Sequence, residues 1–336
     1  MTNTAYTAAR ERAAWLDRSN RGRIVVSGHD RHSYLQGLLT NDIAALTPGT
    51  GCYATYLTAQ GRLIADLWVY ELGDVVLLAM HGDVKDTVLA RLDQFIFGED
   101  VQLGDVTATF AGVAIVGPEA PAILARVVTG VNADTLAALA EHGNVRARLG
   151  DAPAIITHTT DVGESGFDVY VGWEQRDALV LALESAGAVP LDAKSAEAIR
   201  IEAGVPLFHR DMDEETIPLE AGIEQRAISF TKGCYVGQEV IIRVLHRGHG
   251  RVARRLVGLA VDGPVTPERG AVIEAGGKVV GEVTSAAFSP RLGRPVAMGY
   301  VQRDVAEPDV IVRISSSSAG GNGSEAISAR VTQRIS

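Results

Sequence analysis

The chain has 336 residues, with 31 Lys and Arg against 41 Asp and Glu, which gives a formal net charge of −10 at pH 7. This charge argues against a general nucleic-acid-binding protein, because phosphate binding needs a surplus of cations. Hydrophobic residues make up 46% and charged residues 21%, which excludes global disorder. At about 150 residues per domain, the length predicts two domains.

The cysteine content excludes further classes. Only Cys52 and Cys234 are present, and two thiols cannot build a disulfide framework or a four-cysteine zinc or iron–sulfur site. The first twelve residues lack the apolar core of a signal peptide. No stretch approaches the roughly 18 apolar residues of a membrane span. We therefore expect a cytoplasmic protein without a membrane partner.

Up to about residue 246, hairpins join a mixture of strands and helices without a strict βαβ rhythm. This pattern predicts an α+β fold with mainly antiparallel sheet, and Asp30 is expected to cap the first helix. Alternating apolar residues predict strands over 23–27, 51–58, 62–72, 75–80, 107–116, 154–160 and 167–171. Helical spacing predicts helices over 31–39, 83–97, 120–128, 133–142, 174–187, 193–204 and 240–245.

The sequence pattern changes after Gly250: short strand candidates alternate with Gly, Pro and Ser, and no clear helix is predicted. This pattern predicts a small all-β barrel or sandwich. The predicted domains are residues 1–248 and 249–336. The strand candidates cover 252–261, 271–274, 278–286, 297–300, 310–314 and 326–335.

Common catalytic and metal motifs are missing from the sequence. It contains no phosphate-binding loop, no Gly-x-Gly-x-x-Gly after a strand and no His-Glu-x-x-His. His29 and His32, and likewise His246 and His249, lie three residues apart. Neither pair has a nearby cysteine or a clear third ligand, so we expect no metal site.

The most informative stretch surrounds the second cysteine. Two glycines allow a tight turn on either side of it. A cysteine near a helix N-terminus and beside a lysine tends towards the nucleophilic thiolate. The alternative is a small buried hydrophobe, the assignment we also give to Cys52 in its alternating strand. The stretch contains Lys232, Gly233, Cys234, Tyr235, Val236, Gly237, Gln238 and Glu239, with Arg243 four residues further on.

This stretch resembles the K-G-C-[FY]-x-G-Q-E-x-x-x-[RK] signature of the YgfZ family of folate-binding proteins, relatives of the glycine-cleavage T-protein, an aminomethyltransferase. The resemblance continues over most of the chain, at residues 36–42, 163–167, 200–204, 218–222 and 283–301. It implies a T-protein-like folate-binding domain followed by a C-terminal β-barrel. It also implies tetrahydrofolate or a one-carbon derivative as ligand and support of iron–sulfur proteins, including a tRNA-modifying enzyme. We expect a monomer.

The resemblance assigns Asp66 a catalytic role. In the T-protein this segment ends in two adjacent aspartates, of which the second is catalytic. Here Ala65 replaces the first and Asp66 matches the second. A carboxylate beside the reactive nitrogen of folate can accept a proton or stabilise a developing positive charge. The alternative is a solvated aspartate on a strand.

Three further residues are assigned to the folate site. The pterin edge has two adjacent N–H donors, and the Glu164 carboxylate can accept both of them; alternatively, Glu164 is only a turn residue. Arg200 on a predicted helix pairs with a ligand carboxylate or forms a structural salt bridge with Glu202 or Glu220. Tyr235, next to the signature cysteine, is the third.

A cationic segment stands out in this acidic chain. Either its side chains are simply solvated, or they form a rim for the glutamate tail of folate, a tRNA or an acidic protein. It contains Arg243, His246, Arg247, His249, Arg251, Arg254 and Arg255.

Three functions follow from these observations. The first is a folate-binding factor for iron–sulfur proteins with Cys234 as the functional thiol. The second is a folate-dependent one-carbon transferase or demethylase that uses Asp66, although the replacement at Ala65 argues against it. The third is a non-catalytic binding module.

Overall fold

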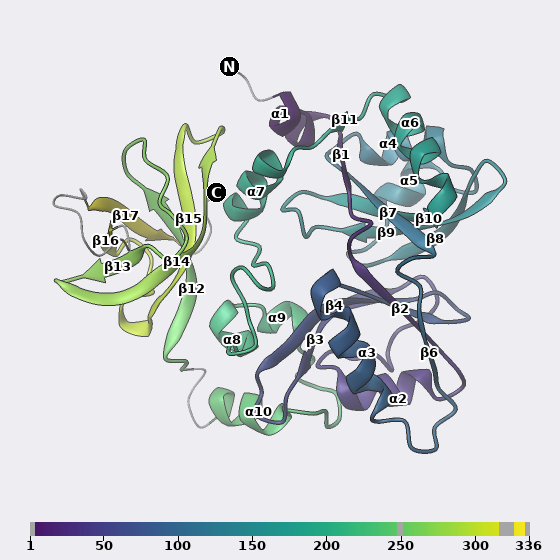
Figure 1. Cartoon of the computed structure of the whole chain (residues 1–336), viewed down its shortest axis with the longest axis horizontal. Helices are drawn as coiled ribbons and strands as arrows, with labels where there is room; N and C mark the ends of the chain where they lie inside the picture. Colours follow the sequence, from purple (N-terminus) through teal and green to yellow (C-terminus); the bar gives the residue numbers. More distant parts are fainter. Residues whose placement is uncertain (1–3, 247–250, 316–325, 333–336) are drawn as a thin grey trace.

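Three β-sheets organise the computed structural model, which describes residues 4–246, 251–315 and 326–332. One sheet has five strands, one has six, and the third is a closed barrel. In Figure 1 they form three lobes, with the barrel on the left, the six-stranded sheet at the upper right and the five-stranded sheet at the lower right. The α+β prediction with a C-terminal barrel is confirmed.

The five-stranded sheet has the order β3-β4-β5-β2-β6, and its interior strand β4, between β3 and β5, is buried along its whole length. The predicted hairpins over 51–80 are confirmed, because local alternation and turn glycines determine them. The Asp30 side chain does not cap α2; it accepts a hydrogen bond from the backbone N–H of Asp100. The elements of this lobe are β2 (Gly22–Ser27), α2 (Arg31–Leu38), β3 (Gly51–Leu57), β4 (Leu63–Glu71), β5 (Val76–Met80), η1 (Gly82–Val84), α3 (Lys85–Asp93) and β6 (Gln102–Asp105).

The six-stranded sheet has the order β11-β1-β7-β10-β9-β8, in which only β1 and β11 pair in parallel. The helix predicted over 133–142 ends at Ala137. His142 takes a left-handed backbone conformation, with φ 64°, that no helix continues through. The elements of this lobe are β1 (Ala14–Asp17), β7 (Phe110–Val116), α4 (Ala120–Val127), α5 (Ala133–Ala137), β8 (Asn144–Leu149), β9 (Ala152–Thr159), β10 (Gly166–Gly172), η2 (Trp173–Gln175), α6 (Arg176–Ser185) and β11 (Val189–Pro190).

The barrel closes in the order β12-β15-β14-β13-β16-β17, which leaves no open edge. The predicted boundary at 248/249 falls within residues 247–250, outside the described residues, and stays a prediction. None of the described helices is both long and apolar enough to cross a bilayer. The barrel contains β12 (Arg254–Val261), β13 (Val272–Ala275), β14 (Lys278–Ser289), β15 (Arg294–Gln302), η3 (Arg303–Val305), β16 (Ile311–Ser315) and β17 (Ile327–Thr332). The remaining helices are α1 (Thr4–Glu11), α7 (Ala193–Glu202), α8 (Pro218–Ala221), α9 (Glu224–Ala227) and α10 (Gln238–His246).

A buried arginine joins helix α7 to the barrel. The Arg200 guanidinium donates to Asp211 Oδ2 and Glu197 Oε1, both at 2.7 Å, and to Ser285 Oγ of β14 at 2.9 Å. Thr284 of the same strand donates to the other Asp211 oxygen. Because Arg200 and Asp211 are both buried, the pair is costly to break from one side.

We predict that Arg200→Met destabilises the protein by about 3–5 kcal/mol, because it leaves the Asp211 carboxylate buried without its cation. Urea unfolding, followed by circular dichroism, measures the loss. Arg291→Met is the matched control, since this half-exposed arginine lies 3.8 Å from its nearest carboxylate, and we expect a change within about 0.5 kcal/mol. Equal unfolding midpoints for the two variants would contradict the prediction.

The signature lysine holds its loop against helix α2. The Lys232 ammonium donates to the carbonyl oxygens of Gln36 and Leu39, each at 2.6 Å, and of Asn41 at 2.9 Å. The last carbonyls of a helix have no partner within the helix, and an ammonium has three donors to offer them. The lysine therefore terminates α2 and anchors the loop that follows α9.

The glycines of the signature allow a second close contact. Gly237 has φ 85°, and a Cβ there would lie 2.5 Å from the Thr58 carbonyl oxygen at the β3–β4 turn. Gly61 of this turn has φ 76°, and its Cβ would lie 2.9 Å from Val240 of α10. Only glycine fits both positions. The start of α10 thus packs directly on the hairpin that carries β4.

We predict that Lys232→Met costs about 1–3 kcal/mol of stability, because three buried or half-buried carbonyl groups lose their donor. Cys234→Ala serves as the matched variant from the same loop. Its side chain is exposed, so we expect a change within about 0.5 kcal/mol. Chemical denaturation of both variants measures the difference. If Cys234→Ala destabilised the protein as much as Lys232→Met, the loop would be anchored differently.

Candidate functional site

Asp66 lies in the middle of buried strand β4 and is only 4% exposed. The Tyr53 hydroxyl of neighbouring strand β3 donates to Asp66 Oδ2 at 2.8 Å. Burial raises the pKa of Asp66, while the Tyr53 hydrogen bond and the charges of Arg21 and His81 oppose this shift. A carboxyl with a raised pKa exchanges its proton closer to neutral pH, as acid–base catalysis requires.

Aromatic rings and two guanidinium groups surround this carboxyl. The Tyr53 and Trp68 ring centroids are 5.6 Å apart. The Arg21 guanidinium lies 4.4 Å from the Trp68 ring centroid, and that of Arg226 lies 5.4 Å from Tyr53. Among the described residues, the buried Trp68 indole N–H has no hydrogen-bond partner. The site thus offers one proton acceptor, two aromatic faces and one unused donor.

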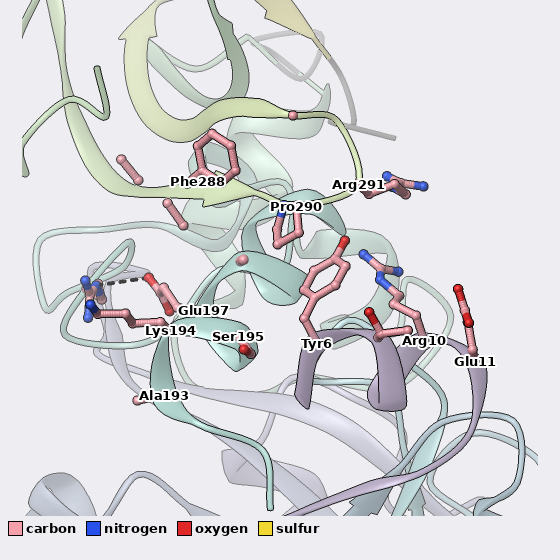
Figure 2. A pocket seen from close by; sticks show the side chains of 16 residues that line it. Tyr6, Arg10, Glu11, Ala193, Lys194, Ser195, Glu197, Phe288, Pro290 and Arg291 are labelled. Atoms are coloured by element: carbon pink, nitrogen blue, oxygen red, sulfur yellow. Dashed lines mark ion pairs between the residues drawn. The ribbon is translucent and has the colours of Figure 1, made fainter. Parts of the chain in front are cut away.

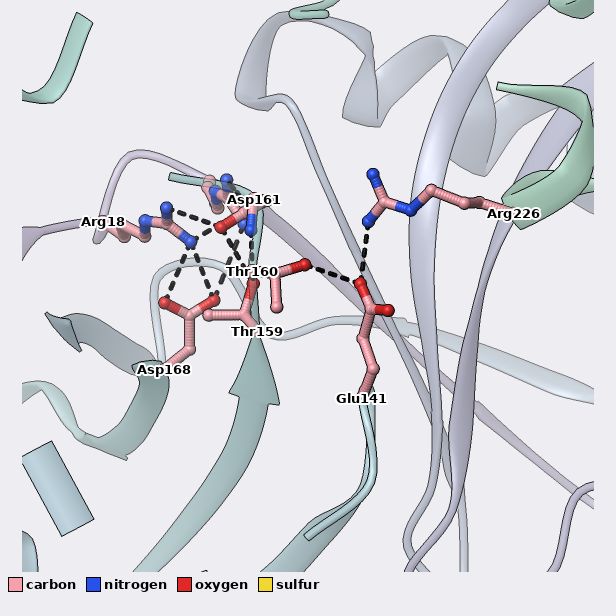
Figure 3. A network of polar contacts seen from close by, with 8 residues as sticks. Arg18, Glu141, Thr159, Thr160, Asp161, Asp168 and Arg226 are labelled. Carbon is pink, nitrogen blue, oxygen red and sulfur yellow. Dashed lines mark hydrogen bonds and ion pairs between the residues drawn. The ribbon is translucent and has the colours of Figure 1, made fainter. Parts of the chain in front are cut away.

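A network of ion pairs borders the site from the six-stranded sheet (Figure 3). Arg18 contacts Asp161 at 2.8 Å and Asp168 at 3.1 Å, and Arg21 also pairs with Asp161. Burial alone would raise the pKa of Asp161, but the Arg18 and Arg21 charges outweigh it and hold this pKa well below its usual range. Asp161 therefore stays ionised, whereas the pKa of Asp66 is shifted upward.

A second group of hydrogen bonds in this network connects Thr160, Glu141 and Arg226. Glu141 accepts hydrogen bonds from Thr160 Oγ1 at 2.6 Å and from Arg226 at 2.9 Å (Figure 3). Arg226 belongs to α9, whereas Thr160 directly follows β9. This group of hydrogen bonds therefore holds the guanidinium group that lies over Tyr53.

The sequence predictions included Asp66 but missed its surroundings. In the hairpin register Tyr53 lies opposite Trp68, and Thr55 lies opposite Asp66. Because alternate residues share one face, this register could have grouped Tyr53 with Asp66. Nothing local signals Arg21 or Arg226, because they reach the site from the β1–β2 connection and from α9, both distant in sequence from β4.

The predicted pterin-binding carboxylate lies in another cluster. Glu164 forms an ion pair with Arg10 of α1, and Arg10 also pairs with the buried Glu202. Arg10 lines a cavity of about 1010 Å³ between α1, α7 and the β14–β15 turn (Figure 2). Asp66 does not line this cavity. Joint action of Glu164 and Asp66 on one ligand stays a prediction.

Among the described residues, Arg200 and Tyr235 form no hydrogen bond or ion pair with Asp66. Arg200 bonds to protein groups, and its acidic partners are Glu197 and Asp211, not the expected Glu202 or Glu220. This follows from the helical spacing of three residues that brings Glu197 alongside it. Tyr235 is buried, which raises its pKa to about 12. Their folate-binding roles remain predictions.

Cys234 and the described part of the cationic segment form no hydrogen bond or ion pair with Asp66. Cys234 is exposed in the loop before α10. On α10, Glu239 and Arg243 line a separate cavity of about 420 Å³. Arg254 pairs with Glu220 at 3.0 Å and stacks on Tyr300. Arg247 and His249 lie outside the described residues. A catalytic role for Cys234 remains a prediction.

Family models match both parts of the chain. Residues 1–232 match the GCVT N-terminal domain, and residues 254–332 match the glycine cleavage T-protein C-terminal barrel domain. An aminomethyltransferase of Streptomyces coelicolor is 34% identical over 309 residues, which cover 90% of this chain and 82% of the relative. An aminomethyltransferase of Bacillus subtilis is 29% identical over 318 residues, which cover 92% and 85%.

A solved structure has the same fold. The glycine cleavage system aminomethyltransferase T from Bartonella henselae superimposes with a TM-score of 0.86 at 24% identity, covering 98% of this chain and 89% of that one. Tetrahydrofolate is the one-carbon carrier of aminomethyltransferases, so the expectation of this ligand is confirmed.

The assignment to the YgfZ family is wrong. The matched families and relatives are those of the T-protein, and nothing in them supports iron–sulfur or tRNA partners. The signature misled because Lys232 and Gly237 serve packing contacts with α2 and the β3–β4 turn, which a related fold can share without sharing a function. The chain belongs to the glycine cleavage T-protein family.

Proposed function

We propose that this protein is a folate-dependent aminomethyltransferase in which Asp66 accepts a proton during transfer of the aminomethyl group. The observation that carries the proposal is a buried carboxyl, hydrogen-bonded by Tyr53, in a chain related along nearly its whole length to aminomethyltransferases. This was the alternative among the functions drawn from the sequence. The relatives are named for transfer of an aminomethyl group, and the acceptor is tetrahydrofolate.

The residues around Asp66 suit a pterin. The unused Trp68 indole N–H can donate to a ring nitrogen or carbonyl. The Tyr53 and Trp68 rings provide apolar contact, and Arg21 and Arg226 provide positive charge. Glu164 remains our proposed second carboxylate for the pterin edge. Its carboxylate also accepts from Arg10, which would hold it ionised and in place.

The protein contributes to the reaction through the basicity of the Asp66 carboxylate. Its burial makes the ionised form more basic, so it accepts a proton from an amine more readily than a solvated aspartate. The Tyr53 hydroxyl holds one oxygen in place. Ala65 precedes Asp66 where the T-protein has a second aspartate, so Asp66 acts without an adjacent carboxylate. Its hydrogen bond comes from Tyr53 on the neighbouring strand β3.

We predict that Asp66→Asn lowers kcat by about 10²–10⁴-fold, the usual contribution of a general base. Asparagine keeps the shape of the side chain but accepts no proton. The assay follows tetrahydrofolate-dependent release of ammonia from an aminomethyl donor, and calorimetry measures tetrahydrofolate affinity separately. Asp74→Asn, at an exposed turn aspartate, is the control. Full activity of Asp66→Asn, or no binding of tetrahydrofolate to the natural protein, would overturn the proposal.

We predict that Tyr53→Phe moves the acidic limb of the kcat/KM profile to higher pH. The hydroxyl donates to the ionised carboxylate and so lowers the pKa of Asp66, as do the charges of Arg21 and His81. Removing the donor raises this pKa further, so a higher pH is needed to ionise the base. The measurement is kcat/KM against pH for both proteins. An unchanged or acid-shifted limb would show that Asp66 is not the titrating base.

A further inference from the structure

Two histidines and an aspartate bring three metal-ligating atoms within 4.8 Å of one another. His81 follows β5, Asp83 lies in η1, and His209 lies in the loop between α7 and α8. Asp83 Oδ1 is 2.5 Å from His81 Nδ1, and Asp83 Oδ2 is 3.1 Å from His209 Nδ1. One carboxylate therefore lies between two imidazole rings.

Packing holds this cluster from both sides. A Cβ on Gly82, between His81 and Asp83, would lie 2.2 Å from the Asn20 carbonyl oxygen, so their turn packs directly on backbone. The His209 ring lies against the buried Phe208 ring, with centroids 4.5 Å apart. Ligand atoms on such supported segments keep their positions, as a metal site requires.

The two carboxylate partners of His209 suit a cation bound between His209 and Asp83. Its Nε2 is 3.1 Å from Glu214 Oε1, and its Nδ1 is 3.1 Å from Asp83 Oδ2. A neutral imidazole has one N–H and satisfies only one of two carboxylates. With the hydrogen on Nε2, the Nδ1 lone pair faces a carboxylate oxygen, and a cation between them makes this contact favourable. Metal-bound histidines commonly donate their other N–H to a carboxylate in this way.

We propose that His81, Asp83 and His209 bind one divalent transition-metal ion of the zinc class, with Glu214 orienting His209. Two imidazole nitrogens and one carboxylate oxygen suit Zn(II), Co(II) or Fe(II), whereas Mg(II) and Ca(II) prefer oxygen ligands only. Three protein ligands leave a coordination position for water or a small ligand. The side chains of His81, Asp83 and His209 are 36%, 57% and 32% exposed, so the ion can enter from solvent.

The three ligands of this site are distinct from the residues proposed to contact the pterin, although His81 also influences the pKa of Asp66, and the two sites are tested separately. Binding of the metal is measured without any transferase assay, so failure of either proposal leaves the other standing. The ligands also come from segments far apart in the sequence. Binding to the folded chain alone therefore raises its stability by mass action.

The first experiment titrates the chelator-treated, full-length protein with Co(II) and records its visible absorption. We expect one equivalent to produce the d–d bands of a nitrogen- and oxygen-ligated ion, and Zn(II) to displace it. We also expect the thermal unfolding midpoint to rise with Zn(II) concentration. Absence of both the bands and the thermal shift would overturn the proposal.

Variants identify the ligands. His209→Gln and Asp83→Asn should each remove the bands, while circular dichroism checks that both proteins fold. Glu214→Gln should retain the bands but weaken Co(II) binding about 10–100-fold, the usual effect of losing an outer-shell partner. His158→Gln is the control, since this histidine bonds to Ser165 outside the cluster. Unchanged Co(II) affinity in His209→Gln, Asp83→Asn or Glu214→Gln would overturn the assigned ligand set.

Discussion

The ion pair between Arg18 and two buried aspartates of the six-stranded sheet fixes the segment that connects this sheet, through β1, to β2 of the five-stranded sheet. Its guanidinium contacts both Asp161 and Asp168, and all three residues are at most 9% exposed. Removing one partner of such a group typically costs about 3–5 kcal/mol, because the remaining charge stays buried. Arg21 extends the pair from Asp161 to the face of Trp68 on β4. Charge pairing thus sets how one sheet faces the other.

The same charges explain why two buried aspartates behave differently. Asp161 has two guanidinium partners and a lowered pKa. Asp66 accepts a hydrogen bond from the Tyr53 hydroxyl and is influenced by the charges of Arg21 and His81. These effects do not outweigh burial, so its pKa is raised. Environments that move the pKa values of two carboxyl groups in opposite directions are typical of acid–base sites. The difference separates a structural carboxylate from one suited to accept a proton.

The separation of Asp66 from Glu164 changes the interpretation of the site. The family resemblance treated both as parts of one folate site. In this structure Arg10 links Glu164 to Glu202 and to the cavity between α1, α7 and the barrel. Asp66 instead contacts Tyr53 within the five-stranded sheet. A ligand bound by both carboxylates would have to contact Glu164 with one part and Asp66 with another.

Elements formed by local patterns were predictable. The β3–β4–β5 hairpins and most barrel strands follow from alternation and turn residues. Strands β1, β6, β8 and β11 were missed. Three of these pair with a partner remote in sequence: β1 lies beside β7, β6 beside β2, and β11 beside β1. The family was misassigned for a similar reason, since the signature lysine binds carbonyl groups of α2, almost two hundred residues earlier.

The sequence by itself determined the fold class and the C-terminal barrel, and the resemblance of its motifs indicated the folate ligand and made Asp66 a candidate residue. These depend on short-range periodicity or on motifs that stay contiguous in the chain. Only the tertiary structure decided which groups surround Asp66, where Glu164 points, and that His81 and His209 meet at Asp83. Burial, ion pairing and shared ligand positions arise between segments that are distant in sequence. No local pattern encodes the distances on which these interactions depend.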